Sequence, residues 1–151
     1  MKHARIRPSI LLVSACLIAG TAFAAEPEDI IKYRQDVMKS QGAHMAAAAA
    51  IIQGKVDYKG QLGDHVKALQ ATSKNVASLF PKDSDFGDTK ASDAVWKNNT
   101  EFQKYAMDVR AKADALAKAV AANDTRNYGA RLKELSDSCK GCHKDFRKEE
   151  K

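Results

Sequence analysis

Cysteine and proline are scarce in this chain of 151 residues, which contains only three of each. Cys16 lies in an apolar run near the N-terminus, and the other two cysteines lie together near the C-terminus. A chain of this length buries enough surface to fold without a disulfide framework. The two C-terminal cysteines are therefore available for chemistry.

The N-terminal segment combines a basic start with an apolar run and indicates a secretory signal peptide over residues 1–24. Small residues flank Phe23 in an A-x-A pattern, so cleavage after Ala24 would leave one mature domain, residues 25–151. The apolar run is shorter than the roughly 20 residues that span a bilayer, so we expect no membrane span. A lipoprotein cleavage site ending at Cys16 is the alternative.

Blocks of like charge are also absent from the mature chain. Without Lys2, Arg5 and Arg7, the 25 lysines and arginines fall to 22 against 19 acidic residues, a formal charge of +3. Charges of both signs alternate along the sequence, which is typical of solvated helix faces. This pattern argues against a nucleic-acid partner and predicts no strong electrostatic preference for any other partner.

A strand pattern is missing too, because apolar residues recur at alternating spacings of four and three, which is a helical period. The expected helices cover about 27–52, 62–80, 95–120 and 128–146. Pro81 ends the second helix, and Ser92 or Asp93 is the expected N-cap of the third. In the polar loop 81–92, Phe86 is the only obvious anchor. The sequence therefore predicts an all-α fold, an antiparallel four-helix bundle.

Two cysteines and a histidine stand together in the sequence CKGCH, as Cys139, Cys142 and His143. The helical period places both cysteines on the apolar seam of the last helix, with the histidine one residue further on. We therefore expect all three side chains to point into the bundle. Such a cluster serves three chemistries: a reactive thiol pair, part of a zinc site, or covalent attachment of haem.

The first two chemistries fit the rest of the sequence poorly. Thiols that exchange disulfides should be partly exposed at a helix N-terminus, whereas these lie near the C-terminal end of a helix. A structural zinc site needs a fourth ligand, and the mature chain offers only His44 and His65 besides the motif histidine. We expect both of these histidines at the surface.

Haem attachment accounts for every member of the motif. In C-x-x-C-H the two thiols form thioethers with one haem c, and the adjacent histidine reaches the iron. Cys139 and Cys142 are then the attachment residues, and His143 is an axial ligand. The signal peptide agrees, because this attachment takes place outside the cytoplasmic membrane, so we expect a periplasmic protein.

Three segments make the chain resemble the class II c-type cytochromes, the cytochrome c′ family. They are YRQDVM at 33–38, AVWKN at 94–98 and CKGCHKDFR at 139–147. In this family the C-x-x-C-H motif lies near the C-terminus, on the fourth helix of a bundle. The resemblance covers residues 27–148 and implies a four-helix bundle with a covalently attached haem.

The resemblance also implies roles for residues outside the motif. Met38 falls at the distal haem position, where a thioether would be a second iron ligand, typical of the low-spin, cytochrome c-556-like branch. Met45 on the same seam is the alternative ligand, and core packing by methionine is a further interpretation. Arg34 and Arg147 match arginines beside the haem, where they could bond its propionates or only cover apolar surface.

The function implied is electron transfer by a periplasmic carrier whose haem iron is held by His143 and Met38. We expect no catalysis on a bound substrate. The redox partners cannot be read from the sequence, and the family resemblance leaves a homodimer open. Two alternatives remain: a cytochrome c′ with an open distal site that binds nitric oxide or carbon monoxide, and a thiol-disulfide oxidoreductase with free cysteines.

Overall fold

The computed structural model describes residues 25–149 of the chain. The expected signal peptide over residues 1–24, which includes Cys16, lies outside the described residues. Among the described helices, none is long and apolar enough to cross a membrane.

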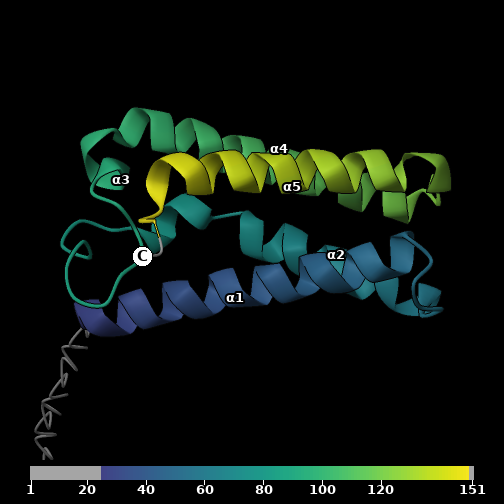
Figure 1. Cartoon of the computed structure of the whole chain (residues 1–151), viewed down its shortest axis with the longest axis horizontal. Coiled ribbons are helices and arrows are strands. Elements are labelled where there is room, and N and C mark those ends of the chain that lie inside the picture. The colour runs from purple at the N-terminus through teal and green to yellow at the C-terminus, as the bar shows by residue number, and fades with distance from the viewer. Residues whose placement is uncertain (1–24, 150–151) are drawn as a thin grey trace, which may run out of the picture.

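Four long helices form the structure, as the helical period predicts. They are α1 (Pro27–Ile52), α2 (Leu62–Ser73), α4 (Asn99–Ala121) and α5 (Tyr128–Phe146), and a short helix, α3 (Ala94–Lys97), precedes α4. Figure 1 shows α4 and α5 together on one side of the molecule and α1 and α2 on the other, with successive long helices running in opposite directions. Over residues 25–149 there is no strand, only an isolated bridge between Ala91 and Arg147. The predicted all-α, antiparallel four-helix bundle is confirmed.

The second helix is shorter than its apolar pattern predicts. α2 ends at Ser73, and a 3₁₀ turn at Val76–Leu79 then carries the chain to Pro81. The hydroxyl of Thr72 donates to the carbonyl oxygen of Ala68 at 2.8 Å, and such bonds compete with regular helix. The apolar series continues past the end of α2 because the 3₁₀ turn still has a buried residue.

The third predicted helix is divided into α3 and α4. Asn98, between them, has φ −113° and ψ 43°, which is outside the helical region. Asp93 is the N-cap residue of α3, as expected, but its side chain makes no capping hydrogen bond. Its carboxylate instead accepts a hydrogen bond from Lys97 at 3.0 Å.

Two clusters of buried side chains make up the core. The large core cluster joins α1, α2, α4 and α5 and consists of Ala48, Ile51, Leu62, Val66, Leu69, Val109, Ala113, Leu116, Leu132 and Leu135. The small core cluster consists of Ala91, Val95, Phe102 and Phe146. Cys139 packs against the large cluster and Cys142 against the small one. The two motif cysteines therefore lie where the two clusters meet.

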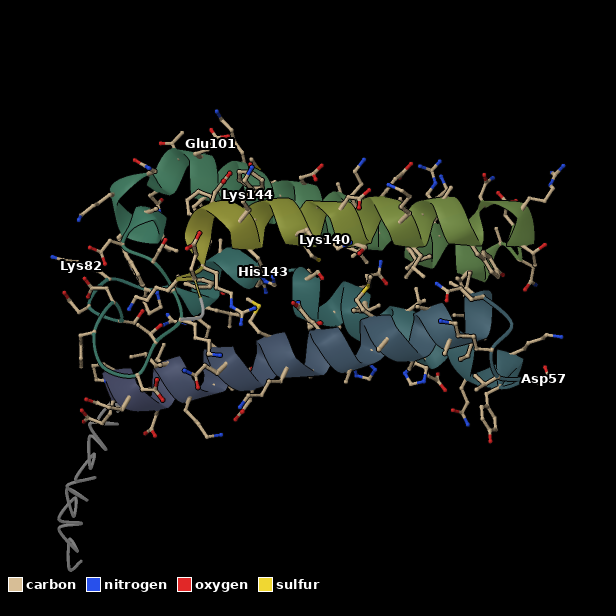
Figure 2. All side chains as sticks on the ribbon, viewed as in Figure 1. Asp57, Lys82, Glu101, Lys140, His143 and Lys144 are labelled. Atoms are coloured by element: carbon tan, nitrogen blue, oxygen red, sulfur yellow. The ribbon has the colours of Figure 1, made fainter. Side chains whose placement is uncertain are left out.

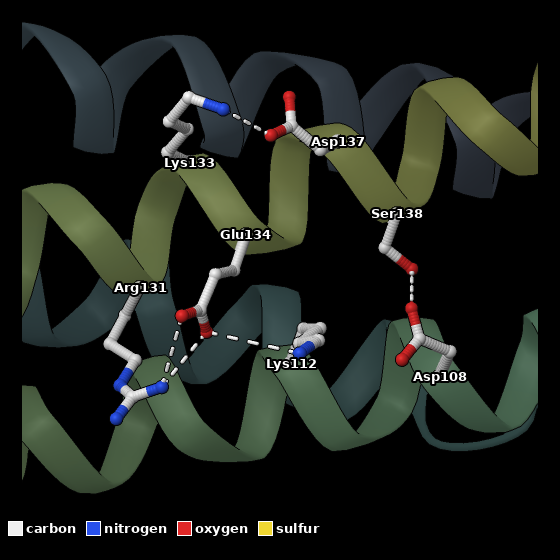
Figure 3. Close-up of polar contacts among 7 residues, drawn as sticks. All are labelled: Asp108, Lys112, Arg131, Lys133, Glu134, Asp137 and Ser138. Carbon is white, nitrogen blue, oxygen red and sulfur yellow. Dashed lines mark hydrogen bonds and ion pairs between the residues drawn. The ribbon is translucent and has the colours of Figure 1, made fainter.

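Polar contacts fix the rotation of α5 against α4 (Figure 3). The hydroxyl of Ser138 donates to Oδ2 of Asp108 at 2.6 Å, and Ser138 is buried directly before Cys139. Glu134 of α5 lies 4.0 Å from Nζ of Lys112 on α4, and it also accepts a hydrogen bond from Arg131 of its own helix at 2.9 Å. Exposed ion pairs of this kind contribute little free energy, so the buried serine is the more specific contact at the start of the motif.

The loop before α3 is anchored by Arg34 of α1, and the expectation that Phe86 anchors it is wrong. Phe86 is 46% exposed, whereas Arg34 is only 3% exposed. The guanidinium donates to the Leu79 carbonyl at 3.2 Å and to Oγ1 of Thr89 at 2.6 Å. It also donates to the hydroxyl and the carbonyl oxygen of Ser84, at 3.0 and 3.1 Å. A buried cation thus supplies the loop with hydrogen bonds that an aromatic ring could not.

Candidate functional site

The C-x-x-C-H motif lies in the last two turns of α5. Cys139 and Cys142 are half-buried free thiols, and His143 is exposed. In Figure 2 the His143 side chain projects from α5 toward the side of the molecule on which α1 lies. The two cysteines are therefore partly enclosed by the bundle, and His143 points toward α1 while much of its surface stays exposed.

Gly141, between the two cysteines, allows α4 to approach the motif closely. A β-carbon at Gly141 would lie 3.3 Å from Cε1 of Tyr105. The Tyr105 hydroxyl donates to Oδ2 of Asp145 at 2.7 Å, and this acceptor is the main cause that raises the pKa of Tyr105. The Tyr105 ring also lies against Phe146, with centroids 5.6 Å apart. Tyr105 supports the motif from α4, a role that the sequence alone did not indicate.

Burial raises the pKa of both thiols. The pKa of Cys142 rises to about 11, first through desolvation and then through the negative charges of Cys139 and Asp145. Desolvation also raises the pKa of Cys139, against a smaller opposing effect of a backbone hydrogen bond. Both side chains are therefore protonated at neutral pH. Disulfide-exchanging cysteines show the opposite shift, which argues against the oxidoreductase alternative.

The imidazole of His143 is neutral at pH 7. Desolvation lowers its pKa first, and the positive charge of Arg147 lowers it further. The side chain keeps a large accessible area, yet enough protein surrounds it to disfavour the charged form. A neutral imidazole is the form that binds a metal ion or a haem iron.

The N-terminal half of α1 and the C-terminal end of α5 lie at the same end of the bundle. Arg34 bonds Oγ1 of Thr89, and the carbonyl oxygen of Thr89 accepts a hydrogen bond from Lys148 at 3.0 Å. α1 begins at this end and α5 ends there. Met38 lies about one helical turn inward from Arg34 on α1, and His143 lies about one turn inward from the end of α5. The predicted distal and proximal residues therefore lie at comparable depths in the bundle.

Met38 and Met45 hold equivalent positions on the seam of α1 but have different surroundings. Met45 packs against the large core cluster. Met38 is half-buried, and among the described residues it is assigned to neither core cluster. Met38 is therefore the methionine that core packing explains less well.

Gln41 lies between these methionines, one turn beyond Met38. Its Nε2 atom is buried and has no hydrogen-bond partner within residues 25–149. A buried donor without an acceptor is unfavourable by about 1–3 kcal/mol, and such a group in a native protein needs an explanation. A bound group that accepts from Nε2 would supply one. In the sequence, the only sign that Gln41 has a special role is that a polar residue stands at a seam position of the helix.

The predicted propionate contact of Arg34 is not tested by these contacts, but the residue has other partners. Its four acceptors within the described residues are neutral oxygens, and its carbon Cζ lies 4.6 Å from the centroid of the Phe80 ring. Burial lowers the pKa of the guanidinium. Arg147 is exposed at the end of α5, its backbone forms a bridge with Ala91, and its charge acts on His143. Its predicted role beside a propionate stays a prediction.

The residues fit a haem bound between α5 and α1. α5 presents two protonated thiols three residues apart and a neutral histidine next to the second. The facing helix provides a methionine outside the packed core and a buried amide without an acceptor. Within residues 25–149 there is no group of three or more His, Cys, Asp or Glu side chains that could hold a metal ion on their own.

Comparison with known proteins gives a consistent result. The sequence matches the family described as Cytochrome C' over residues 29–147. It is 35% identical to cytochrome c' of Pararhodospirillum photometricum over 124 residues, which cover 82% of this chain and 99% of the relative. It is 30% identical to cytochrome c-556 of Agrobacterium fabrum over 139 residues, which cover 90% of each protein.

A solved structure has the same fold. It is the nitric oxide complex of a leucine-to-alanine variant of cytochrome c prime from Alcaligenes xylosoxidans, with 25% identity and a TM-score of 0.77. The match covers 85% of this chain and all of the other. With its C-x-x-C-H motif on the last helix of a four-helix bundle, the chain belongs to the cytochrome c′ family of haem c-type cytochromes.

Proposed function

We propose that this protein carries one covalently attached haem c and binds nitric oxide or carbon monoxide on the distal side of that haem. Cys139 and Cys142 would form the two thioethers, and His143 would be the proximal ligand. When bound, the haem supplies an iron centre that can take up a diatomic ligand or an electron. The residues of this chain decide between these two uses.

The observation that carries the gas-binding proposal is the buried Nε2 atom of Gln41. It has no partner within the described residues and lies one turn beyond Met38 on the same seam of α1. Polarity and hydrogen-bond donors on the distal side favour the binding of a diatomic ligand. An amide that has no protein acceptor is available to donate to such a ligand.

The comparisons support the same proposal. Relatives named cytochrome c' align with most of the chain, and one solved relative is a nitric oxide complex. Met38 would then line the distal side as an apolar wall, a role that suits a half-buried side chain outside the packed core. Neutral His143 would hold the proximal position at physiological pH.

Electron transfer, the function expected from the sequence, is the second candidate. Met38 itself favours it, because a thioether sulfur is a good ligand for ferrous haem and raises the reduction potential. In this case His143 and Met38 would saturate the iron. In both cases we propose a periplasmic protein that binds a diatomic gas or carries an electron. In neither case does it catalyse a reaction on a substrate.

The absorption spectrum and the carbon monoxide reactivity of the purified protein distinguish the two candidates. For gas binding we expect a high-spin, five-coordinate haem in both oxidation states and fast binding of carbon monoxide to the ferrous form. The variant Met38→Leu should keep this spectrum. Because this replacement nearly conserves volume, it should cost less than about 1.5 kcal/mol of stability. Met45→Leu on the same seam is the matched control.

The opposite set of results would overturn the gas-binding proposal. These are a low-spin wild-type spectrum, a near-infrared band of a methionine-sulfur ligand, and slow or absent carbon monoxide binding. Conversion to a high-spin form by Met38→Leu but not by Met45→Leu would then assign the second ligand to Met38. Conversion by Met45→Leu alone would place that ligand two turns along α1.

A further inference from the structure

Two histidines outside the haem motif lie in contact between α1 and α2. The Nδ1 atoms of His44 and His65 are 3.0 Å apart, and the ring centroids are 5.3 Å apart with the planes inclined by 50°. Both side chains are half-buried at the surface, and their contact with each other was not expected from the sequence. A neutral pair can share one hydrogen at this distance, with one Nδ1 donating and the other accepting.

The same spacing suits two ligands of one metal ion. Imidazole nitrogens bind zinc at about 2.0–2.1 Å, so two of them would be about 3.3–3.4 Å apart at the tetrahedral angle of zinc, and about 2.9 Å apart at the right angle of a square-planar Cu²⁺ or Ni²⁺ site. The observed separation of the two Nδ1 atoms is 3.0 Å. This value lies between the two spacings, and in a metal-bound pair each ring would carry its hydrogen on Nε2.

We propose that His44 and His65 form a binding site for a divalent late transition-metal ion such as Zn²⁺, Ni²⁺ or Cu²⁺. Neutral imidazole prefers these ions over Mg²⁺ and Ca²⁺, which take oxygen ligands. The described residues provide no third His, Cys, Asp or Glu in a group that could hold the ion. Water completes the coordination, so the site is open and exchangeable.

Both imidazoles are only partly buried, so an ion can reach the pair from solvent. Ser40, one turn before His44, uses its hydroxyl to donate to the carbonyl oxygen of Val37 at 2.8 Å. Asp64 precedes His65 in the sequence and is exposed. Its carboxylate is the nearest negative charge in sequence and can attract a cation without being a ligand.

This site is separate from the haem ligands and has its own consequence. His44 follows Met38 by six residues, which is about 9 Å along the axis of α1. An ion held by one residue of α1 and one of α2 cross-links the two helices. Because it binds the folded chain, it should raise the unfolding temperature as its free concentration rises above the dissociation constant.

The test is a titration of the intact, haem-containing protein with Zn²⁺ alone, after removal of metals with a chelator. Calorimetry should show one zinc ion per chain, and the same zinc concentration should raise the unfolding temperature. His44→Asn and His65→Asn should each weaken binding by more than about tenfold, since even indirect changes around a metal site cost tenfold or more. Asp64→Asn is the matched control and should still bind zinc.

The proposal would be overturned if the wild-type protein did not bind zinc, or if both histidine variants bound zinc as tightly as the wild type. The haem spectrum and the unfolding temperature in chelator show whether each variant is folded. If a variant is not folded, the nuclear magnetic resonance signals of the two imidazoles in the wild-type protein show whether these rings bind zinc. Both sets of signals should shift on addition of one equivalent of Zn²⁺, and unchanged signals would contradict the site.

Discussion

At the scale of single residues, burial sets the chemical form of the C-x-x-C-H motif. Desolvation raises the pKa of both thiols and lowers the pKa of His143, so all three groups are neutral at pH 7. Neutral thiols are poor partners for disulfide exchange, and a neutral imidazole is a good ligand. The same burial therefore disfavours a redox thiol pair and favours haem ligation.

Replacement of Gln41 tests whether its amide faces a bound ligand. In Gln41→Leu the unpaired donor is gone, so we expect the ligand-free protein to be as stable as the wild type or more stable, by about 1 kcal/mol. Affinity for carbon monoxide or nitric oxide should fall by about fivefold, the equivalent of one hydrogen bond of about 1 kcal/mol. The infrared stretching frequency of bound carbon monoxide should change, and an unchanged frequency would show that the amide does not contact the ligand.

The residues proposed to hold the haem could be identified in the sequence because C-x-x-C-H has fixed spacing and residue types. The supporting residues were not, since each depends on a contact between distant parts of the chain. Tyr105 approaches Gly141 from α4, and Ser138 bonds Asp108 across two helices. The pairing of His44 with another helix likewise depends on how the two helices pack.

At the scale of elements, α1 organises both the distal side and the loop before α3. Arg34 provides three hydrogen bonds to that loop and one to the 3₁₀ turn before it, and Met38 and Gln41 follow on the same seam. Because α1 bonds the loop through Arg34 and faces α5 one turn later, it couples the loop to the proposed haem side of the bundle. The loop is thus part of the structure that positions the site.

Replacement of Arg34 distinguishes its observed role as an anchor of the loop from its predicted contact with a haem propionate. Arg34→Leu leaves several buried oxygens without a donor, so unfolding should become easier by about 2–5 kcal/mol. Arg34→Lys keeps the charge but cannot span all four acceptors. For a loop anchor, Arg34→Lys should speed amide hydrogen exchange in residues 84–91 and change the reduction potential little. A changed potential with unchanged exchange would support the propionate contact instead.

Surface pairs on α5 predict a dependence of stability on acid pH. Hydrogen bonding and the charge of Lys133 lower the pKa of Asp137 against opposing desolvation. A lowered folded pKa stabilises the protein above the unfolded value, roughly 3.9, and this contribution is lost as the pH falls through the folded pKa. Urea denaturation from pH 5 to pH 2 should show a smaller pH dependence for Asp137→Asn than for wild type. Added salt should reduce that difference, and a difference that salt leaves unchanged would contradict an exposed pair.

The helix boundaries show where periodicity is a sufficient guide. α1 and α5 end where the apolar pattern and the flanking residues predict, because each is one uninterrupted amphipathic segment. α2 ends early because buried positions continue into a 3₁₀ turn with the same apolar spacing. Asn98 interrupts the third segment without disturbing its apolar series. The apolar period indicates which residues are buried, but it does not indicate whether the backbone between them is regular helix.

At the scale of the whole molecule, the bundle has two core clusters with the cysteines at their junction. Cys139 packs against the large cluster and Cys142 against the small one. A group attached to both thiols would contact both parts of the core and would bury apolar surface between α5 and α1. We therefore expect the haem to contribute to the stability of the whole bundle, in addition to its chemistry.

Covalent haem attachment can be checked by the intact mass of the mature protein from a host that attaches haem to exported cytochromes. We expect the mass of residues 25–151 plus one haem, retained after denaturation because two thioether bonds hold it. The control, Cys139→Ala with Cys142→Ala, should have the polypeptide mass alone and lose its colour in denaturing electrophoresis. A wild-type chain without added mass would contradict covalent haem attachment through this motif.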